Sequence, residues 1–108
     1  MGFSTKKCVP CKGGVKPLSQ NEVKNLLSEI DGWQTNAEFN LIVKDIKFRN
    51  FEQALEFVNK VGKIAEEQNH HPDIKMGWGY CNITLQSHSI GGLHENDFII
   101  AAKINEIK

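Results

Sequence analysis

Three of the four histidines in this 108-residue chain lie close together in the sequence, and an acidic residue follows them. His70 and His71 are adjacent, Pro72 comes directly after them, and His88 and Asp97 follow. Imidazole is the side chain best suited to moving protons near neutral pH, and it is also a common metal ligand. The cluster therefore predicts either proton-transfer chemistry or a metal site.

A metal site is the less favoured of these two interpretations. Three histidines and one open position would suit a catalytic zinc ion. Adjacent histidines seldom converge on one ion, however, and the sequence contains no HExxH pattern. We therefore expect no metal, and we keep a metal hydrolase with histidine ligands as an alternative.

The sequence predicts that His70 lies at the end of a helix. Apolar residues recur at helical spacing over residues 51–65, and Pro72 disfavours the helical conformation at His71. The carboxyl end of a helix stabilises a cation, and Glu66 lies four residues before His70, within reach of an ion pair. We expect His70 to pair with Glu66 and to be able to donate a proton.

His88 and Asp97 are expected on the next two elements. Residues 79–86 alternate in polarity as a strand does, and His88 continues their polar row onto the open side of the sheet. In a final helix over residues 94–107, Asp97 would stand at the third position, where a carboxylate supports the first turn. A structural and a functional role are thus both open for Asp97, and His94 is expected to be only a surface residue.

The remaining patterns predict the architecture. A capping-box sequence, Ser19 to Glu22, starts a helix, and residues 41–48 indicate a strand. The order helix, strands, helix, strands, helix favours an α+β fold, an antiparallel sheet with its helices packed on one face. Residues 1–17 are expected to be an irregular lead-in, and residues 18–108 a single domain.

Composition excludes some partners. Lys and Arg together number 13, as do Asp and Glu, so the formal net charge is zero and no basic surface for nucleic acid or an anionic membrane is predicted. No apolar run is long enough to span a bilayer, and no secretory signal is apparent. A cytoplasmic location is therefore expected.

The three cysteines indicate no disulfide framework, because their number is odd and no signal is apparent. Cys8 and Cys11 form a CxxC pair, but a zinc ribbon needs a second pair and only Cys81 is left. Cys81 falls on the apolar side of its strand and is expected to be buried. The role of the CxxC pair stays open.

The last helix predicts self-association. Its apolar residues lie nearly all round, and we reasoned that a terminal helix in so small a domain cannot bury two faces. We therefore expect at least a dimer, with Ile100, Ile104 or Ile107 near the interface.

The same residues resemble a known family, the pterin-4a-carbinolamine dehydratases. The resemblance runs from about residue 18 to 107 and is carried by residues 66–74 (EEQNHHPDI), by Ser87-His88 and by Asp97. It implies a four-stranded antiparallel sheet with three helices, assembled as a homodimer or homotetramer. It also implies a lyase that dehydrates 4a-hydroxytetrahydrobiopterin to quinonoid dihydrobiopterin without metal or organic cofactor. The pterin would be recycled for aromatic amino acid hydroxylation, with a functional link to phenylalanine hydroxylase.

The resemblance also implies the site. The family's catalytic histidines fall on His70, His71 and His88, and substrate-binding or supporting positions fall on Glu66, Trp78, Ser87 and Asp97. The family's usual threonine before the third histidine is Ser87 here, which keeps the hydroxyl, and its usual helix-capping threonine is His94. A dimerisation or regulatory binding module without turnover is the other alternative, because animal members of the family also act in that way.

Overall fold

The computed structural model describes residues 3–9 and 15–107 of the chain. These residues form an α+β fold around a four-stranded antiparallel sheet with strand order β1-β2-β4-β3. The predicted fold class is thereby confirmed. The strands are β1 (Gln34–Thr35), β2 (Ile42–Lys47), β3 (Asp73–Gly77) and β4 (Tyr80–Leu85). The α-helices are α1 (Gln20–Leu27), α2 (Phe51–Gln68) and α3 (Glu95–Asn105), and two short 3-10 helices are η1 (Phe3–Thr5) and η2 (His88–Ile90).

Helix ends form where the capping signals predict them. At the start of α1, the Ser19 hydroxyl accepts from the Glu22 amide at 3.2 Å, and the Glu22 carboxylate accepts from the Ser19 amide at 2.8 Å. At the start of α2, the Asn50 side chain accepts from the amide of Gln53 at 2.8 Å. Because these side chains satisfy amides that the helix leaves without partners, they fix where each helix begins.

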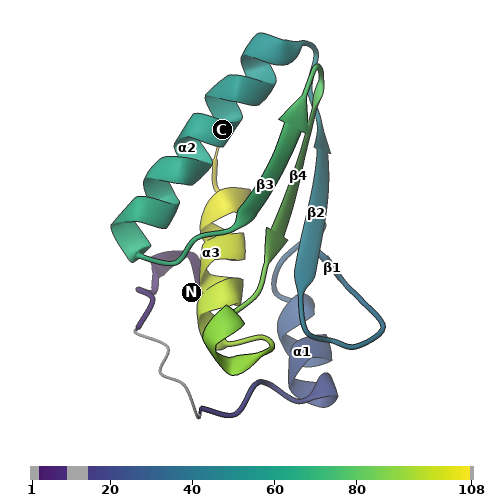
Figure 1. Cartoon of the computed structure of the whole chain (residues 1–108), viewed down its shortest axis with the longest axis vertical. Coiled ribbons are helices and arrows are strands. Elements are labelled where there is room, and N and C mark those ends of the chain that lie inside the picture. Colours follow the sequence, from purple (N-terminus) through teal and green to yellow (C-terminus); the bar gives the residue numbers. More distant parts are fainter. Residues whose placement is uncertain (1–2, 10–14, 108) are drawn as a thin grey trace.

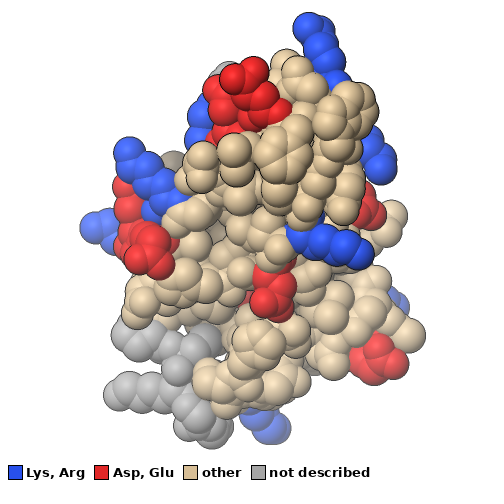
Figure 2. Space-filling model, turned by 45° about the horizontal axis from the view of Figure 1, so that its top comes forward, with Lys and Arg blue, Asp and Glu red and all other residues tan. Residues whose placement is uncertain are grey.

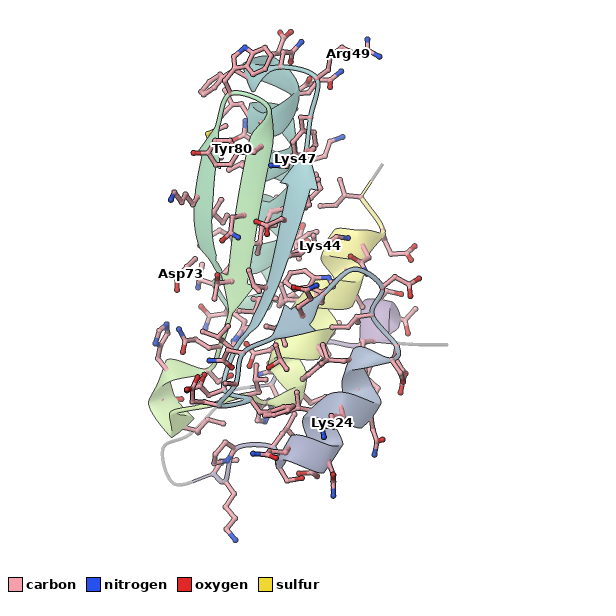
Figure 3. All side chains as sticks on the ribbon, turned by 90° about the vertical axis from the view of Figure 1, so that its right-hand side faces the viewer. Lys24, Lys44, Lys47, Arg49, Asp73 and Tyr80 are labelled. Atoms are coloured by element: carbon pink, nitrogen blue, oxygen red, sulfur yellow. The ribbon has the colours of Figure 1, made fainter. Side chains whose placement is uncertain are left out.

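The sheet has one buried and one open face. Alternate residues of β2 and β4, such as Ile42, Ile83 and Leu85, are fully buried. Their neighbours in the sequence point the other way, and Figure 3 looks onto this open face, with Lys47 and Tyr80 on adjacent strands. The strand pattern thus places the polar row of β4 outside the core, as the alternation predicts.

Helices α2 and α3 lie on the same side of the sheet in Figure 1. Only part of the apolar face of α2 is buried: Ala54, Val61 and Ala65 lie in the core, whereas Phe51 is 46% exposed and Leu55 is 42% exposed. The 18-residue α2 runs diagonally and ends beside the start of β3. This arrangement brings the carboxyl end of α2 and the amino end of α3 to the part of the molecule where the histidines lie.

The interface on α3 was expected because a terminal helix in so small a domain was thought unable to bury two faces, and this premise is wrong. Ile100 is 0% exposed and Ile104 is 2% exposed within the single chain. The lead-in supplies the missing cover, because Phe3 of η1 is itself buried and its ring centroid lies 6.2 Å from that of Phe98. Only Ile107 is half-buried, and it borders a cavity of about 540 Å³ between α2, β2 and α3.

Charged side chains of both signs are interspersed on the face that Figure 2 shows. Equal numbers of basic and acidic residues in the sequence agree with this mixture. Within residues 3–9 and 15–107, no helix is long and apolar enough to cross a membrane.

Candidate active site

The centre of the site is a buried contact between Asp97 of α3 and His70, which lies two residues after the last residue of α2. Nε2 of His70 lies 2.7 Å from Oδ1 of Asp97. The Asp97 side chain is 0% exposed and that of His70 is 13% exposed. A carboxylate buried this completely needs hydrogen-bond partners, because water cannot reach it. The pair therefore fixes the ring of His70 relative to α3.

The other oxygen of Asp97 has two further donors. The hydroxyl of Ser87 donates to Oδ2 at 2.8 Å, and the backbone amide of His94 donates to the same atom at 3.0 Å. Ser87 is buried and is held by a bridge to Gly92. Asp97 thus has the structural role considered for it, because it completes the cap of α3, and its other oxygen contacts His70.

His94 is part of this cap rather than a simple surface residue. Its side chain is half-buried, and Nδ1 accepts from the amide of Asn96 at 3.0 Å. An imidazole can replace a capping hydroxyl because its unprotonated nitrogen is also an acceptor. The expectation that His94 only faces solvent is therefore wrong.

Glu66 pairs with His71, not with His70 as expected. Nε2 of His71 lies 2.6 Å from Oε2 of Glu66, and both side chains are exposed. The reason is Asn69, which takes the left-handed conformation (φ 52°, ψ 40°) and ends α2. His70 consequently leaves the helical path, so the four-residue spacing to Glu66 no longer brings the two side chains together.

His88 lies next to a carboxylate that the sequence reasoning did not include in the site. Its Nε2 is 3.9 Å from Oδ2 of Asp73, and both side chains are 71% exposed. Asp73 begins β3 and pairs with Thr84 of β4, so it faces the open side of the sheet as predicted for His88. Figure 3 shows Asp73 towards the end of the sheet where η2 lies. Asp73 directly follows the His70-His71-Pro72 run, and this proximity in the sequence is what could have suggested it as a site residue.

Two carboxylates connect the segments that carry the three histidines. Asp97 links His70 to Ser87, the residue before His88. Asp73, two residues after His71, then reaches the His88 ring. Each imidazole thus faces a carboxylate, from Asp97, Glu66 or Asp73, and the three pairs lie at one end of the sheet.

The contact with Asp97 assigns a donor on the His70 ring. An ionised carboxylate only accepts hydrogen bonds, so Nε2 of His70 donates to Asp97, and Nδ1 is the ring nitrogen that this contact leaves unused. The rings of His71 and His88 are more than half exposed, so a ligand can reach them. Such a set can give a proton to one ligand atom and take one from another.

Trp78 is the predicted site residue that the structure leaves apart from the others. It lies in the turn between β3 and β4 and is 71% exposed. His71 precedes β3 and Trp78 follows it, so the length of the strand separates them within one chain. In Figure 3 the neighbouring Tyr80 is far up the sheet from Asp73.

Metal-ligating side chains do not gather in the part of the chain that the structure describes. No group of three or more His, Cys, Asp or Glu residues there could hold a metal ion. Cys81 is buried as expected, and burial raises the pKa of its thiol. Cys11 lies outside the described residues, so the CxxC pair cannot be described as a unit.

The fold and the site define a class of protein: a small α+β domain with three imidazole–carboxylate pairs suited to proton transfer. The family model described as pterin 4 alpha carbinolamine dehydratase matches residues 16–107, and the chain belongs to this family. A protein of Rubrobacter xylanophilus that carries the family's name is 52% identical, over 97% of each chain. One from Methylococcus capsulatus is 45% identical, over 97% of this chain and 92% of the relative.

Solved structures also resemble the chain, two of them as follows. One, titled a transcriptional coactivator/pterin dehydratase from Brucella melitensis, is 31% identical with a TM-score of 0.79 and covers 83% of this chain and 96% of its own. The other is titled a pterin dehydratase-like protein and a RuBisCO assembly factor in the alpha-carboxysome. It is 25% identical with a TM-score of 0.59, over 68% of this chain and 89% of its own.

Proposed function

We propose that this protein is a hydro-lyase that dehydrates 4a-hydroxytetrahydrobiopterin to quinonoid dihydrobiopterin and water. Membership of the dehydratase family supports the reaction class. The observation that carries the proposal is the buried Asp97, which accepts from His70, Ser87 and the amide of His94. A buried carboxylate that orients one imidazole beside two exposed ones supports acid–base catalysis.

The reaction needs two proton transfers. The bond between C4a and the hydroxyl oxygen breaks as that oxygen gains a proton and leaves as water, and a ring nitrogen of the pterin loses a proton. We assign His71 as the acid–base group at the hydroxyl, and His70 and His88 as groups that orient the substrate and help the proton transfer. Their different carboxylate partners and exposures support a division of the two tasks.

The supporting residues follow from these assignments. Glu66 would hold the ring of His71, while Asp97 and Ser87 would hold that of His70. Trp78 takes part in no step within one chain, because it lies at the other end of β3.

The wider setting is part of the same proposal. The pterin would be recycled for aromatic amino acid hydroxylation, with phenylalanine hydroxylase as the functional partner, in a cytoplasmic homodimer or homotetramer without metal or organic cofactor. Since Ile100 and Ile104 are buried within the chain, contacts between copies would involve other surfaces.

The direct test is turnover by the purified protein. The carbinolamine is generated in situ, and the appearance of the quinonoid product is followed by absorbance, with the spontaneous dehydration rate subtracted. We expect the protein to accelerate the reaction in proportion to its concentration. A rate equal to the uncatalysed background would contradict the proposal.

A binding module is the second candidate function, favoured by the titles of the two similar structures, which name a coactivator and an assembly factor. It requires no turnover, and therefore no proton donor. The same assay discriminates the two, because a binding module would leave the carbinolamine at its background rate.

A further inference from the structure

The N-terminal brace, defined as residues 3–9, runs along α3 and reaches the carboxyl end of α2 (Figure 1). We propose that this brace positions the His70–Asp97 pair, through the side chains of Gln68 and Asn96. The inference rests on the proposed function for its effect on turnover, and on geometry alone for its effect on the pair.

Asn96 holds the brace at the first turn of α3. Its side chain is 2% exposed, and both of its amide atoms contact one residue of the brace. The Val9 amide donates to Oδ1 at 3.0 Å, and Nδ2 donates to the Val9 carbonyl at 2.5 Å. Two opposed hydrogen bonds fix the direction of the backbone as well as its position. Asn96 directly precedes Asp97 in the sequence, so the brace is attached next to the buried carboxylate.

Gln68 holds the brace at the other element. The amide of Cys8 donates to Oε1 of Gln68 at 2.8 Å. Gln68 is the last residue of α2 and stands two residues before His70. One peptide segment, Cys8 and Val9, therefore links the element that carries His70 to the element that carries Asp97. The His70–Asp97 contact joins the same two parts of the chain, so these parts are connected twice, once by the brace and once by that contact.

The rest of the brace is anchored firmly enough for this role. Phe3 is 6% exposed and packs against Phe98 on α3. The Lys103 ammonium donates to the carbonyl of Ser4 at 2.9 Å, and Lys6 pairs with Glu95 at 3.2 Å. The brace is therefore tied to α3 at several points, and its contact with Gln68 ties it to α2 as well.

The effect of the Cys8–Gln68 contact on turnover depends on how accurately the His70 ring must be placed. A proton-transfer site works only within a narrow range of positions, and a misplacement of about 1 Å can cost about 100-fold in rate. The Cys8–Gln68 contact and the His70–Asp97 contact both tie the end of α2 to the start of α3, so loss of the first leaves more of the positioning to the second. Gln68 and Asn96 are thus positioning residues, which touch neither substrate nor proton.

The experiment compares three substitutions in the full chain. Gln68→Ala removes the acceptor for the Cys8 amide, Gln68→Glu keeps an acceptor of the same shape, and Glu67→Ala is the control on the exposed neighbour. We measure kcat/KM well below the melting temperature. We also measure the ring ¹⁵N shifts of His70 at one fixed pH, which report the hydrogen bond from Nε2.

We expect Gln68→Ala to lower kcat/KM by about 3-fold to about 100-fold and to change the His70 shifts. We expect Gln68→Glu and Glu67→Ala to have values of kcat/KM and of the His70 ring shifts close to those of the parent protein. Asn96→Ala should act in the same direction as Gln68→Ala, with a lower melting temperature because Asn96 is buried.

The ring shifts separate this inference from the proposed function. If the parent protein shows no turnover, a change of the His70 shifts in Gln68→Ala still supports the brace. Parent values of the shifts in Gln68→Ala, or equal changes in Glu67→Ala, would overturn it. A lower melting temperature with unchanged shifts and unchanged kcat/KM would show that the contact serves stability alone, and would also overturn it.

Discussion

Nε2 of His70 and Oδ1 of Asp97 lie 2.7 Å apart, although the two residues are 27 positions apart in the sequence. Each belongs to a helix end that is capped by its own local device: the left-handed Asn69 after α2, and the capping box at the start of α3. Asp97 is a member of that capping box, so one carboxylate serves both the fold and the chemistry. Stability and activity should therefore be coupled at this residue.

Asp97→Asn tests this coupling. An amide retains an acceptor oxygen but has no charge to balance an imidazolium, so the orientation of His70 should suffer. We expect kcat/KM to fall by at least about tenfold, less than the roughly 100-fold or more that loss of an acid–base group itself costs. Thermal melting should also show a loss of stability, because the buried oxygens hold three donors. Glu106→Gln, an exposed change at the other end of α3, is the matched control. Full activity in Asp97→Asn would contradict the assigned role.

Alanine substitutions should separate the histidines. Because general acid–base groups contribute about 10²- to 10⁴-fold, we expect His71→Ala and His88→Ala each to lower the rate by at least about tenfold above background, with the fold retained. Both side chains are exposed, so their removal leaves no buried gap. His70→Ala should impair turnover and also cost stability, since it leaves Asp97 buried without its partner.

His94→Ala is the informative control in this series. It removes the acceptor for the Asn96 amide, and loss of an N-cap costs about 0.5–2 kcal/mol. The melting temperature should therefore fall, while kcat/KM of the folded protein changes little. The site assignment would be wrong if His94→Ala reduced the rate as strongly as His71→Ala, or if His88→Ala kept full activity.

Chelation should leave the rate unchanged. In the described part of the chain, no group of three metal-ligating side chains comes together, and each site imidazole faces a carboxylate instead. The expected result is equal turnover before and after exhaustive treatment with a chelator, with metal content checked by elemental analysis. A large loss of rate that zinc restores would favour the metal hydrolase alternative.

Local signals predicted the elements well, because they depend on neighbouring residues. The capping residue Ser19, the alternation in β4 and the buried Cys81 all have the expected places. The three histidines and Asp97 were all named from the sequence. The partner of each histidine was harder to predict from the sequence. The left-handed conformation of Asn69 turns His70 away from Glu66, so that it contacts Asp97 instead.

Contacts between distant segments could not be predicted from periodicity. Nothing near Phe3 indicates that it covers α3, so the apolar faces of that helix were interpreted as a subunit interface. The partner of His88 was missed for a related reason: Asp73 is brought near it by strand pairing across the β3–β4 turn. Such contacts depend on register and packing, which single residues do not reveal.

The thiol of Cys81 should be unreactive toward thiol reagents in the folded protein. It is 1% exposed, and burial raises the pKa of its thiol, so little of the reactive thiolate forms at neutral pH. In a variant with Cys8→Ser and Cys11→Ser, we expect a thiol reagent to label the native protein far more slowly than the unfolded protein. Labelling at equal rates would show that β4 opens readily.

Asn105 should be a polar residue on which the stability of the fold depends. Its Oδ1 accepts from Nε1 of Trp33 at 3.0 Å and from Nζ of Lys44 at 2.7 Å, and its Nδ2 donates to the Asp31 carbonyl at 3.0 Å. Asn105→Ala would leave half-buried donors without an acceptor, at about 1–3 kcal/mol for such a group. In a chain of this size, the melting temperature should fall by about 4–8 °C for each kcal/mol lost.

The pH dependence of this loss provides a check on its cause. Burial lowers the pKa of Lys44, while the nearby Asp31 opposes that shift. Because the folded pKa lies below the unfolded value, the charged ammonium is the form that costs stability, and this cost disappears as the pH rises above both values. Asn105 offsets the cost by accepting from Nζ, so the difference between the parent protein and Asn105→Ala should shrink as Lys44 loses its proton. Denaturant unfolding at neutral pH and at about pH 11.5, above the ordinary lysine pKa, measures this difference. Asn59→Ala, at an exposed position of α2, is the control, and an equal loss at both pH values would show that Lys44 is not involved.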